Sequence, residues 1–332
     1  MDKEPETPAL DRVYLAPLAG YTDLPFRRAC QKQGLLHGFT PMVDACSLAF
    51  APDKNKRILV RGEDESWLGT QLLGQDPDML GKAADILNAG FYDTMDLNLG
   101  CPVKKVTQKG GGAALGLDRD RAARCLEAVV RNSRAPVTAK LRVLHDQDPK
   151  PTVELATTLV EAGATALTIH GRVWDKVYAG PVAWQVIASV REAVNVPVVA
   201  NGGVFDRRSG LELAAQTGCS RIMIARGAIG NPWIFAQFGN MPQPPPTHAE
   251  VCATMHAQIK GMVDLYGEEV GMRNARKIIL AYLVGRGYRR SQRARVTSLA
   301  TFAQFEGLYG EVLDEGPLCT VQGTWKSGLP DE

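Results

Sequence analysis

Short apolar runs alternate with longer stretches of helical spacing along most of the chain. Seven runs rich in β-branched and other apolar residues predict strands, and an eighth, at 39–43, gives a weaker signal because Pro41 interrupts it. Strands that are apolar on both faces are typical of parallel sheets covered by helices, so the alternation predicts an α/β fold. The predicted strands cover residues 13–16, 39–43, 69–73, 94–99, 136–141, 166–170, 196–200 and 221–225.

The stretches between these strands carry apolar residues at the spacing of a helix face. Asp76-Pro77-Asp78 is typical of a helix start, helices are predicted over 118–131 and 152–162, and Gly90 and Gly163 are expected to end helices. Eight strand–helix units between residues 12 and 240 suit a closed parallel (β/α)8 TIM barrel. A doubly wound open sheet is the alternative, but no G-x-G-x-x-G follows the first strand.

The composition changes after residue 240. Residues 241–247 contain four prolines and predict a linker, and residues 1–11 and 317–332 are expected to be a loose N-terminal tail and a flexible C-terminal tail. Helical spacing returns over 248–316, which predicts a small all-helical C-terminal domain. Its helices are expected over 247–266, 273–283, 291–300 and 302–309.

Composition excludes several classes of protein. No run approaches the roughly 18 apolar residues that span a bilayer, and the acidic start over residues 1–6 lacks the apolar centre of a signal peptide. We therefore expect a cytoplasmic protein with no membrane partner. Seven cysteines without a C-x-x-C pair indicate neither a zinc site nor a disulfide framework, so no metal is expected.

Charge is uneven along the chain although the net charge is only +2. Residues 270–304 contain no acidic residue, which predicts a local basic surface; the other interpretation is a solvated helical face. The eight cations of this stretch are Arg273, Arg276, Lys277, Arg286, Arg289, Arg290, Arg293 and Arg295.

Polar residues gather where the predicted strands end, and in a barrel that face carries the active site. They are Gln71, Asn98, Cys101, Lys140, His170, Asn201 and Arg226, and Pro17 stands at the same place after the first strand. Glycine-rich turns after the last two strands, at 201–203 and 225–227, expose backbone N–H groups that suit a phosphate, with Arg226 as a charged partner.

The remaining strand-end groups suit an aromatic redox cofactor. Lys140 could face the electron-rich end of a reduced flavin, and the Gln71 amide could pair with a ring edge. His170 is either a donor to a ring carbonyl or phosphate, or a satisfied core histidine. Arg142 is expected to face the opposite side of the strand and to be structural.

Cys101 follows a strand and precedes Pro102, with three glycines at 110–112, so its thiol is expected on a mobile loop. It is either a small buried hydrophobe, a proton donor or, as thiolate, a nucleophile.

Several motifs together resemble those of tRNA-dihydrouridine synthases, and the B-type bacterial subgroup is the most similar. They are Ala-Pro-Leu-Ala-Gly-Tyr-Thr-Asp-Leu-Pro-Phe-Arg at 16–27, Asn-Leu-Gly-Cys-Pro at 98–102, Lys-Lys-Val at 104–106, Ile-His-Gly-Arg at 169–172, Ala-Asn-Gly-Gly at 200–203, Arg-Gly-Ala at 226–228 and Pro-Trp-Ile-Phe at 232–235. The resemblance covers about residues 12–300. One departure is Pro41, since the family often has an acidic residue before the methionine at 42.

The resemblance implies an FMN-bearing barrel that reduces the C5–C6 bond of specific uridines in tRNA, with NADPH or NADH as reductant. It implies Cys101 as general acid, Asn98 beside the uracil and, we expect, a monomer that binds tRNA through the helical domain. The cofactor residues implied are Pro17, Leu18, Ala19, Gln71, Lys140, His170, Asn201, Gly202, Gly203, Ala225 and Arg226, and those for tRNA are Arg273, Arg276, Lys277, Arg286, Arg289 and Arg290. The rivals are an FMN-dependent reductase of a free pyrimidine and a non-catalytic tRNA-binding protein of the same fold.

Overall fold

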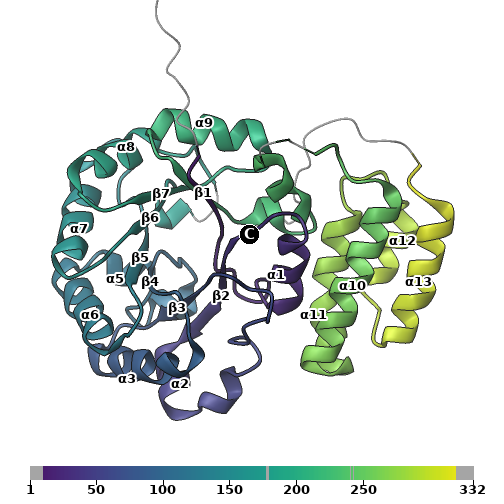
Figure 1. The fold of residues 1–332 in the computed structure, drawn as a ribbon, viewed down its shortest axis with the longest axis horizontal. Coiled ribbons are helices and arrows are strands. Elements are labelled where there is room, and N and C mark those ends of the chain that lie inside the picture. The colour runs from purple at the N-terminus through teal and green to yellow at the C-terminus, as the bar shows by residue number, and fades with distance from the viewer. Residues whose placement is uncertain (1–9, 177–178, 240, 242, 319–332) are drawn as a thin grey trace, which may run out of the picture.

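A computed structural model describes residues 10–176, 179–239, 241 and 243–318. Eight parallel strands pair in chain order, and the last pairs with the first, so the sheet is a closed barrel (Figure 1). This confirms the predicted TIM barrel. The strands are β1 (Arg12–Leu15), β2 (His37–Asp44), β3 (Leu68–Leu73), β4 (Thr94–Leu99), β5 (Val137–Arg142), β6 (Leu167–His170), β7 (Val198–Asn201) and β8 (Arg221–Ile224).

Pro41 lies within a strand instead of ending it. β2 runs through this proline, and its register against β3 shifts between Phe39 and Met42. Proline has no N–H to give to the ladder, and an irregular register is where a strand accommodates it. The weaker sequence signal therefore marks a bulge inside a full barrel strand.

Helices surround the barrel on its outer side (Figure 1). Asp76 caps α3 by accepting from the N–H groups of Asp78 and Met79, as its sequence predicts. Gly163, with a φ of 103°, lies just after the end of α7. Gly90 lies in a 3₁₀ turn that follows α3, and the left-handed conformation is adopted by the next residue, Phe91, at φ 52°. The helices are α1 (Leu24–Gln31), α2 (Ala45–Phe50), α3 (Pro77–Leu87), α4 (Lys104–Thr107), α5 (Ala113–Gly116), α6 (Arg119–Asn132), α7 (Lys150–Glu161), α8 (Trp184–Ala193) and α9 (Arg207–Thr217).

In the part of the chain that the structure describes, four α-helices follow the barrel: α10 (His248–Tyr266), α11 (Glu268–Leu283), α12 (Arg290–Val296) and α13 (Phe302–Glu315). α11 begins earlier than predicted because only Gly267, at φ 81°, separates it from α10. α12 ends at Val296, earlier than the predicted residue 300, and Thr301 caps the next helix, α13. Of the two predicted tails, residues 1–9 and 319–332 lie outside the described residues.

The four C-terminal helices have a core of their own, which Trp233 from the end of the barrel region joins. α10 lies beside α1 of the barrel (Figure 1). The backbone approaches closely at Gly230, because a Cβ there would lie 2.4 Å from the Ala281 backbone. Nearby, Arg286 donates to the Gly230 carbonyl at 2.9 Å. Among the described residues, no helix is both long enough and apolar enough to cross a membrane.

Alternation along the strands divides the barrel residues between two environments. Outward residues such as Leu72, Leu97 and Ile169 join the helices in the large core. A separate cluster fills the interior, with Tyr14, Phe39, Val199 and Met223 at its centre. Polar residues occupy the interior positions nearer the carboxyl ends of the strands, and these form the floor of the cavity described below.

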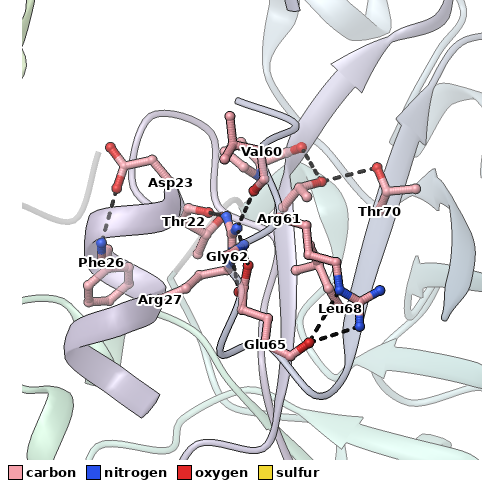
Figure 2. A network of polar contacts seen from close by, with 12 residues as sticks. Thr22, Asp23, Phe26, Arg27, Val60, Arg61, Gly62, Glu65, Leu68 and Thr70 are labelled. Atoms are coloured by element: carbon pink, nitrogen blue, oxygen red, sulfur yellow. Dashed lines mark hydrogen bonds and ion pairs between the residues drawn. The ribbon is translucent and has the colours of Figure 1, made fainter. Parts of the chain in front are cut away.

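One buried ion pair attaches the chain between β2 and β3 to α1 (Figure 2). Arg27 is fully buried, and its Nε and Nη2 donate to Glu65 at 2.6 and 2.8 Å. The same guanidinium donates to the carbonyls of Thr22 and Val60. Each charge is therefore balanced where water is excluded.

Candidate active site

The carboxyl ends of the strands open into a cavity of about 560 Å³. It brings together every residue for which a cofactor role is predicted, from Pro17 to Arg226, along with Asn98 and Cys101. The six basic residues predicted to bind tRNA are not among its lining residues. The cavity combines a thiol, cations, an imidazole, amides and glycine turns, a set suited to binding an anionic planar molecule.

A chain of hydrogen bonds forms the cavity floor. Asp96 accepts from the Thr138 hydroxyl and from Gln71 Nε2, both at 2.6 Å. Asn98 Nδ2 then donates to Gln71 Oε1 at 2.7 Å. Burial raises the pKa of Asp96 to about 6, against the hydrogen bonds from Gln71 and Thr138, which lower it.

Asp96 was not among the site residues predicted from the sequence. A carboxylate in an otherwise apolar strand, two residues before Asn98 and hence on the same face, was the available signal.

Lys140 is held over the cavity by Asn201. Its Nζ donates to Asn201 Oδ1 at 3.1 Å, and Asn201 Nδ2 donates to the Met223 carbonyl at 2.7 Å. Burial first, and then the nearby Arg142, lower the pKa of Lys140 to about 8, while Asp96 opposes the shift. Lys140 is therefore largely a cation at neutral pH.

Arg142 also lines the cavity, so the expectation that it faces the opposite side was wrong. Residues two apart on a strand point the same way, and this places Arg142 on the face of Lys140. Its Nε donates to the Gly100 carbonyl at 2.8 Å, next to Cys101.

His170 ends β6 inside the cavity. Burial first, and then the nearby cations Lys140 and Arg142, hold its pKa well below the ordinary value. The imidazole is therefore neutral at pH 7 and offers one N–H donor and one acceptor. A Cβ on Gly202 would lie 3.1 Å from His170 Cδ2, so a larger residue there would crowd the ring.

The two glycine turns expose backbone to the cavity. Gly202 and Gly203 have φ values of 127° and 74°, which residues other than glycine rarely adopt. A Cβ on Gly227 would lie 2.2 Å from the Val204 carbonyl oxygen. With Arg226 beside them, these turns are consistent with a phosphate site.

The Cys101 loop is hydrogen-bonded on both sides. Asn98 Oδ1 accepts from the N–H groups of Gly100 and Cys101 at 3.1 and 2.9 Å, and the Cys101 carbonyl accepts from Ala113 N–H at 3.0 Å. Gly112, at φ 57°, permits this, since a Cβ there would lie 2.6 Å from the Cys101 carbonyl oxygen. The glycines predicted to free the loop thus include one that lets it pack closely.

The Cys101 side chain is partly exposed. Burial raises the pKa of this thiol, while the Val103 backbone hydrogen bond and the cations Arg142 and Lys140 partly offset the increase. The group is a protonated thiol at neutral pH, which favours the proton-donor interpretation over the thiolate nucleophile. No cluster of potential metal ligands occurs in the part of the chain that the structure describes.

The basic residues of 270–304 do not form one uncompensated patch, contrary to the sequence-based expectation. Acidic residues from outside the stretch reach them, since Arg273 pairs with Glu269 at 3.9 Å and Arg289 pairs with Glu315 at 3.1 Å. Arg295 likewise pairs with Glu311.

The predicted tRNA residues also differ in their positions. Arg286 is half-buried against the barrel, and Arg276 donates to the Leu299 carbonyl at 2.7 Å. Lys277 lies beside the cavity, because its Nζ is 3.8 Å from the ring centre of Tyr21, which lines the cavity. Arg290, by contrast, is exposed at the start of α12.

Known proteins place the chain in a family. The model of the dihydrouridine synthase (Dus) family matches residues 14–309. The tRNA-dihydrouridine synthase B of Pasteurella multocida is 34% identical over 280 residues, which are 83% of this chain and 84% of that protein. The tRNA-dihydrouridine synthase B of Pseudomonas aeruginosa is 36% identical over 279 residues, covering 82% and 84%.

A solved structure of histamine dehydrogenase from Rhizobium sp. 4-9 is similar in fold alone, with a TM-score of 0.52 and 12% identity over 75% of this chain and 48% of that one. The extent of the family match and the identity to its bacterial members decide the assignment. The chain belongs to the dihydrouridine synthase family and is a tRNA-dihydrouridine synthase, an oxidoreductase.

Proposed function

We propose that the protein binds FMN in the 560 Å³ cavity and reduces the C5–C6 bond of specific tRNA uridines, with Cys101 as general acid. One observation carries the proposal: a protonated thiol opens into the same cavity as Lys140, the neutral His170 and the two glycine turns. When bound, FMN supplies the two-electron reduction that a carbon–carbon double bond requires, with NADPH or NADH as the source of electrons.

The residues present fit this cofactor. The turns at 201–203 and 225–227, with Arg226, would hold the phosphate, since their exposed backbone and positive charge suit an anion. Lys140 would face the ring system, where its charge favours the reduced form. Gln71 and His170 would donate to ring acceptors. Pro17, Leu18, Ala19 and Ala225 would line the flavin through backbone and apolar contacts.

Cys101 would hold a proton at Sγ and deliver it to C5 of the uracil as C6 is reduced. The resulting thiolate would regain its proton from solvent, and Lys140 and Arg142 would stabilise it until then. Asn98 would orient the uracil, because its side chain lines the cavity beside the thiol. The uridine has to leave the stack of tRNA bases before it can enter this site.

Basic residues of α11, α12 and the segment between them would bind the tRNA backbone. Exposed cations contact phosphates without reading sequence, and this suits a folded RNA. Lys277 lies beside the cavity, and Arg286 would act indirectly by holding the helices on the barrel. The residues proposed to contact tRNA are Arg273, Arg276, Lys277, Arg289 and Arg290.

The first experiment is a visible spectrum of the purified protein, followed by anaerobic addition of NADPH and then of tRNA lacking dihydrouridine. We expect flavin absorption that bleaches with NADPH and returns with tRNA, and we expect the protein to elute as a monomer in size-exclusion chromatography. Free uracil or uridine serves as the control substrate and should leave the flavin reduced. A protein that takes up no flavin even after reconstitution with FMN would refute the proposal. Reoxidation by the free base as readily as by tRNA would instead support the small-molecule rival.

A further inference from the structure

The cavity floor contains a carboxylate for which the proposed reaction has no direct use. Asp96 is buried within the barrel and is not among the residues that line the cavity. It nevertheless ends a chain of hydrogen bonds that begins at the backbone of Cys101. The groups at the two ends of this chain determine which group donates and which accepts in each hydrogen bond between them.

At the Cys101 end, two backbone N–H groups need an acceptor. Asn98 can supply one only through Oδ1, which leaves its Nδ2 as a donor. Gln71 must then accept through Oε1, so its own Nε2 must donate, and the Asp96 carboxylate is the group that accepts it. The orientation of both amides is therefore fixed by hydrogen-bonding requirements rather than by shape.

This polarity determines what the floor offers to a ligand. Each amide nitrogen carries a second hydrogen, and both Gln71 and Asn98 line the cavity. If either amide were turned round, a carbonyl oxygen would replace that donor and meet another acceptor in the chain. The floor thus matches the hydrogen-bond acceptors of a ligand, which are the carbonyl oxygens of uracil and of the pyrimidine edge of a flavin, and the unprotonated ring nitrogens of the flavin.

We infer that Asp96 is a positioning residue that fixes the amide orientations of Gln71 and Asn98, so that both donate into the cavity and Asn98 holds the Cys101 backbone. The inference rests on the proposed function for its link to catalysis. The Thr138 hydroxyl supports Asp96 from the neighbouring strand, since it donates to the second carboxylate oxygen at 2.6 Å. Hydrogen bonds linked in one direction strengthen one another.

Two substitutions of Asp96 distinguish the need for a hydrogen-bond acceptor from the need for a side chain of this shape. Asp96→Leu keeps the branched shape, with a larger side chain, but has no acceptor, whereas Asp96→Asn keeps one oxygen that can face Gln71 if its nitrogen turns toward Thr138. Thr138→Val is the matched control, because it removes the other bond to Asp96 and leaves the path to Cys101 intact. Gln71→Met interrupts the same path one step later and carries the test if Asp96→Leu does not fold.

The first readout is hydrogen exchange at the Gly100 and Cys101 amides, measured in protein without flavin. We expect exchange there to rise about tenfold or more in Asp96→Leu and Gln71→Met, the cost of an unsatisfied buried group, with little change in Asp96→Asn and Thr138→Val. The second readout is the dissociation constant of FMN, which should rise in the leucine variant and recover in the asparagine variant.

Unchanged exchange at both amides in a folded Asp96→Leu variant would overturn the inference. So would equal acceleration across all barrel amides, which would indicate general destabilisation, or an asparagine variant as impaired as the leucine one. The exchange measurement needs no flavin and no tRNA. Failure of the wild-type protein to bind FMN would therefore count against the proposed function and leave the positioning role of Asp96 to be judged separately.

Discussion

Lys140 Nζ donates to Asn201 Oδ1 at 3.1 Å and so links β5 to β7 across the cavity, past His170 on the strand between them. Asn201 can accept this bond because its Nδ2 is committed to the Met223 carbonyl. The ammonium group is thereby held among the cavity-lining residues rather than extended into solvent. In the proposed function this is the charge that favours reduced flavin.

Replacing Lys140 by methionine should remove that charge with little change in volume. We expect flavin reduction by NADPH to slow at pH 7. The wild-type rate should fall as pH rises through about 8, where Lys140 loses its proton, and the variant should lack this fall. Stopped-flow bleaching of the flavin at a series of pH values on both sides of this pKa measures both effects. Lys150→Met, at an exposed position at the start of α7, is the control and should keep the wild-type dependence of the rate on pH. A fall in rate near pH 8 that persists in Lys140→Met would show that another group titrates.

Replacing Cys101 by alanine should abolish most uridine reduction and keep the flavin. Loss of a general acid costs about 10²- to 10⁴-fold in rate. Alanine keeps the main-chain hydrogen bonds of residue 101 and loses only the bond between the thiol and the Val103 backbone. Dihydrouridine formed in tRNA, quantified by mass spectrometry, is the measurement. Cys46→Ala provides the control for a cysteine outside the cavity lining. Turnover that survives in Cys101→Ala would exclude the thiol as the acid.

The raised pKa of Cys101 gives a second test of its state. Because burial disfavours the thiolate, alkylation of Cys101 in the flavin-free protein should accelerate only at a pH above that of an ordinary thiol. Arg142→Met should move the midpoint further up, since a cation that stabilises the thiolate is removed. Mass spectrometry of the peptide containing Cys101 follows the reaction. A midpoint below that of an unstructured cysteine peptide would contradict the burial argument.

The strands and the strand-end residues were predictable because their signals are local. Apolar runs mark strands buried on both faces, and a polar residue at the end of such a run is placed at the barrel mouth by topology alone. Lys140 and His170 could therefore be assigned to one site from their positions along the chain. Pro41 weakened the signal for β2 because sequence does not distinguish a bulge from a strand end.

The features that sequence does not predict depend on contacts between distant segments. Glu311 and Glu315 lie outside the acid-free stretch 270–304, yet the fold pairs them with Arg295 and Arg289. The role of Asp96 is visible only once β3, β4 and β5 lie side by side. Arg142 is a different case, since alternation along β5 was sufficient to place it beside Lys140.

The buried pair Arg27–Glu65 should be essential to stability (Figure 2). Arg27→Met leaves Glu65 as an uncompensated buried charge, which typically costs about 3–5 kcal/mol. Urea unfolding followed by circular dichroism measures the decrease. Arg119→Met breaks a pair of the same length on the surface, with Glu154, and should cost about 0–1 kcal/mol. Equal decreases in the free energy of unfolding of Arg27→Met and Arg119→Met would contradict the argument from burial. The double variant Arg27→Met/Glu65→Leu should recover part of the stability that Arg27→Met loses.

The basic residues of the C-terminal helices should separate into two groups by their effect on tRNA binding. Arg273→Gln and Arg290→Gln remove exposed cations, so each should weaken binding and reduce the slope of log affinity against log salt by about 1. Arg131→Gln on α6, on the other side of the barrel, is the control and should change neither (Figure 1). Filter binding of tRNA over a range of salt concentrations provides the data.

Arg286 should behave differently from this exposed group. Burial lowers its pKa to about 10, and its guanidinium donates to the Gly230 and Tyr282 carbonyls while lying over Trp233. Arg286→Gln should therefore lower the unfolding midpoint and weaken tRNA binding without changing the salt slope, because the substitution loosens the attachment of the C-terminal helices to the barrel and leaves the phosphate contacts in place. A change in slope equal to that of Arg290→Gln, with stability unaffected, would place Arg286 on the RNA instead.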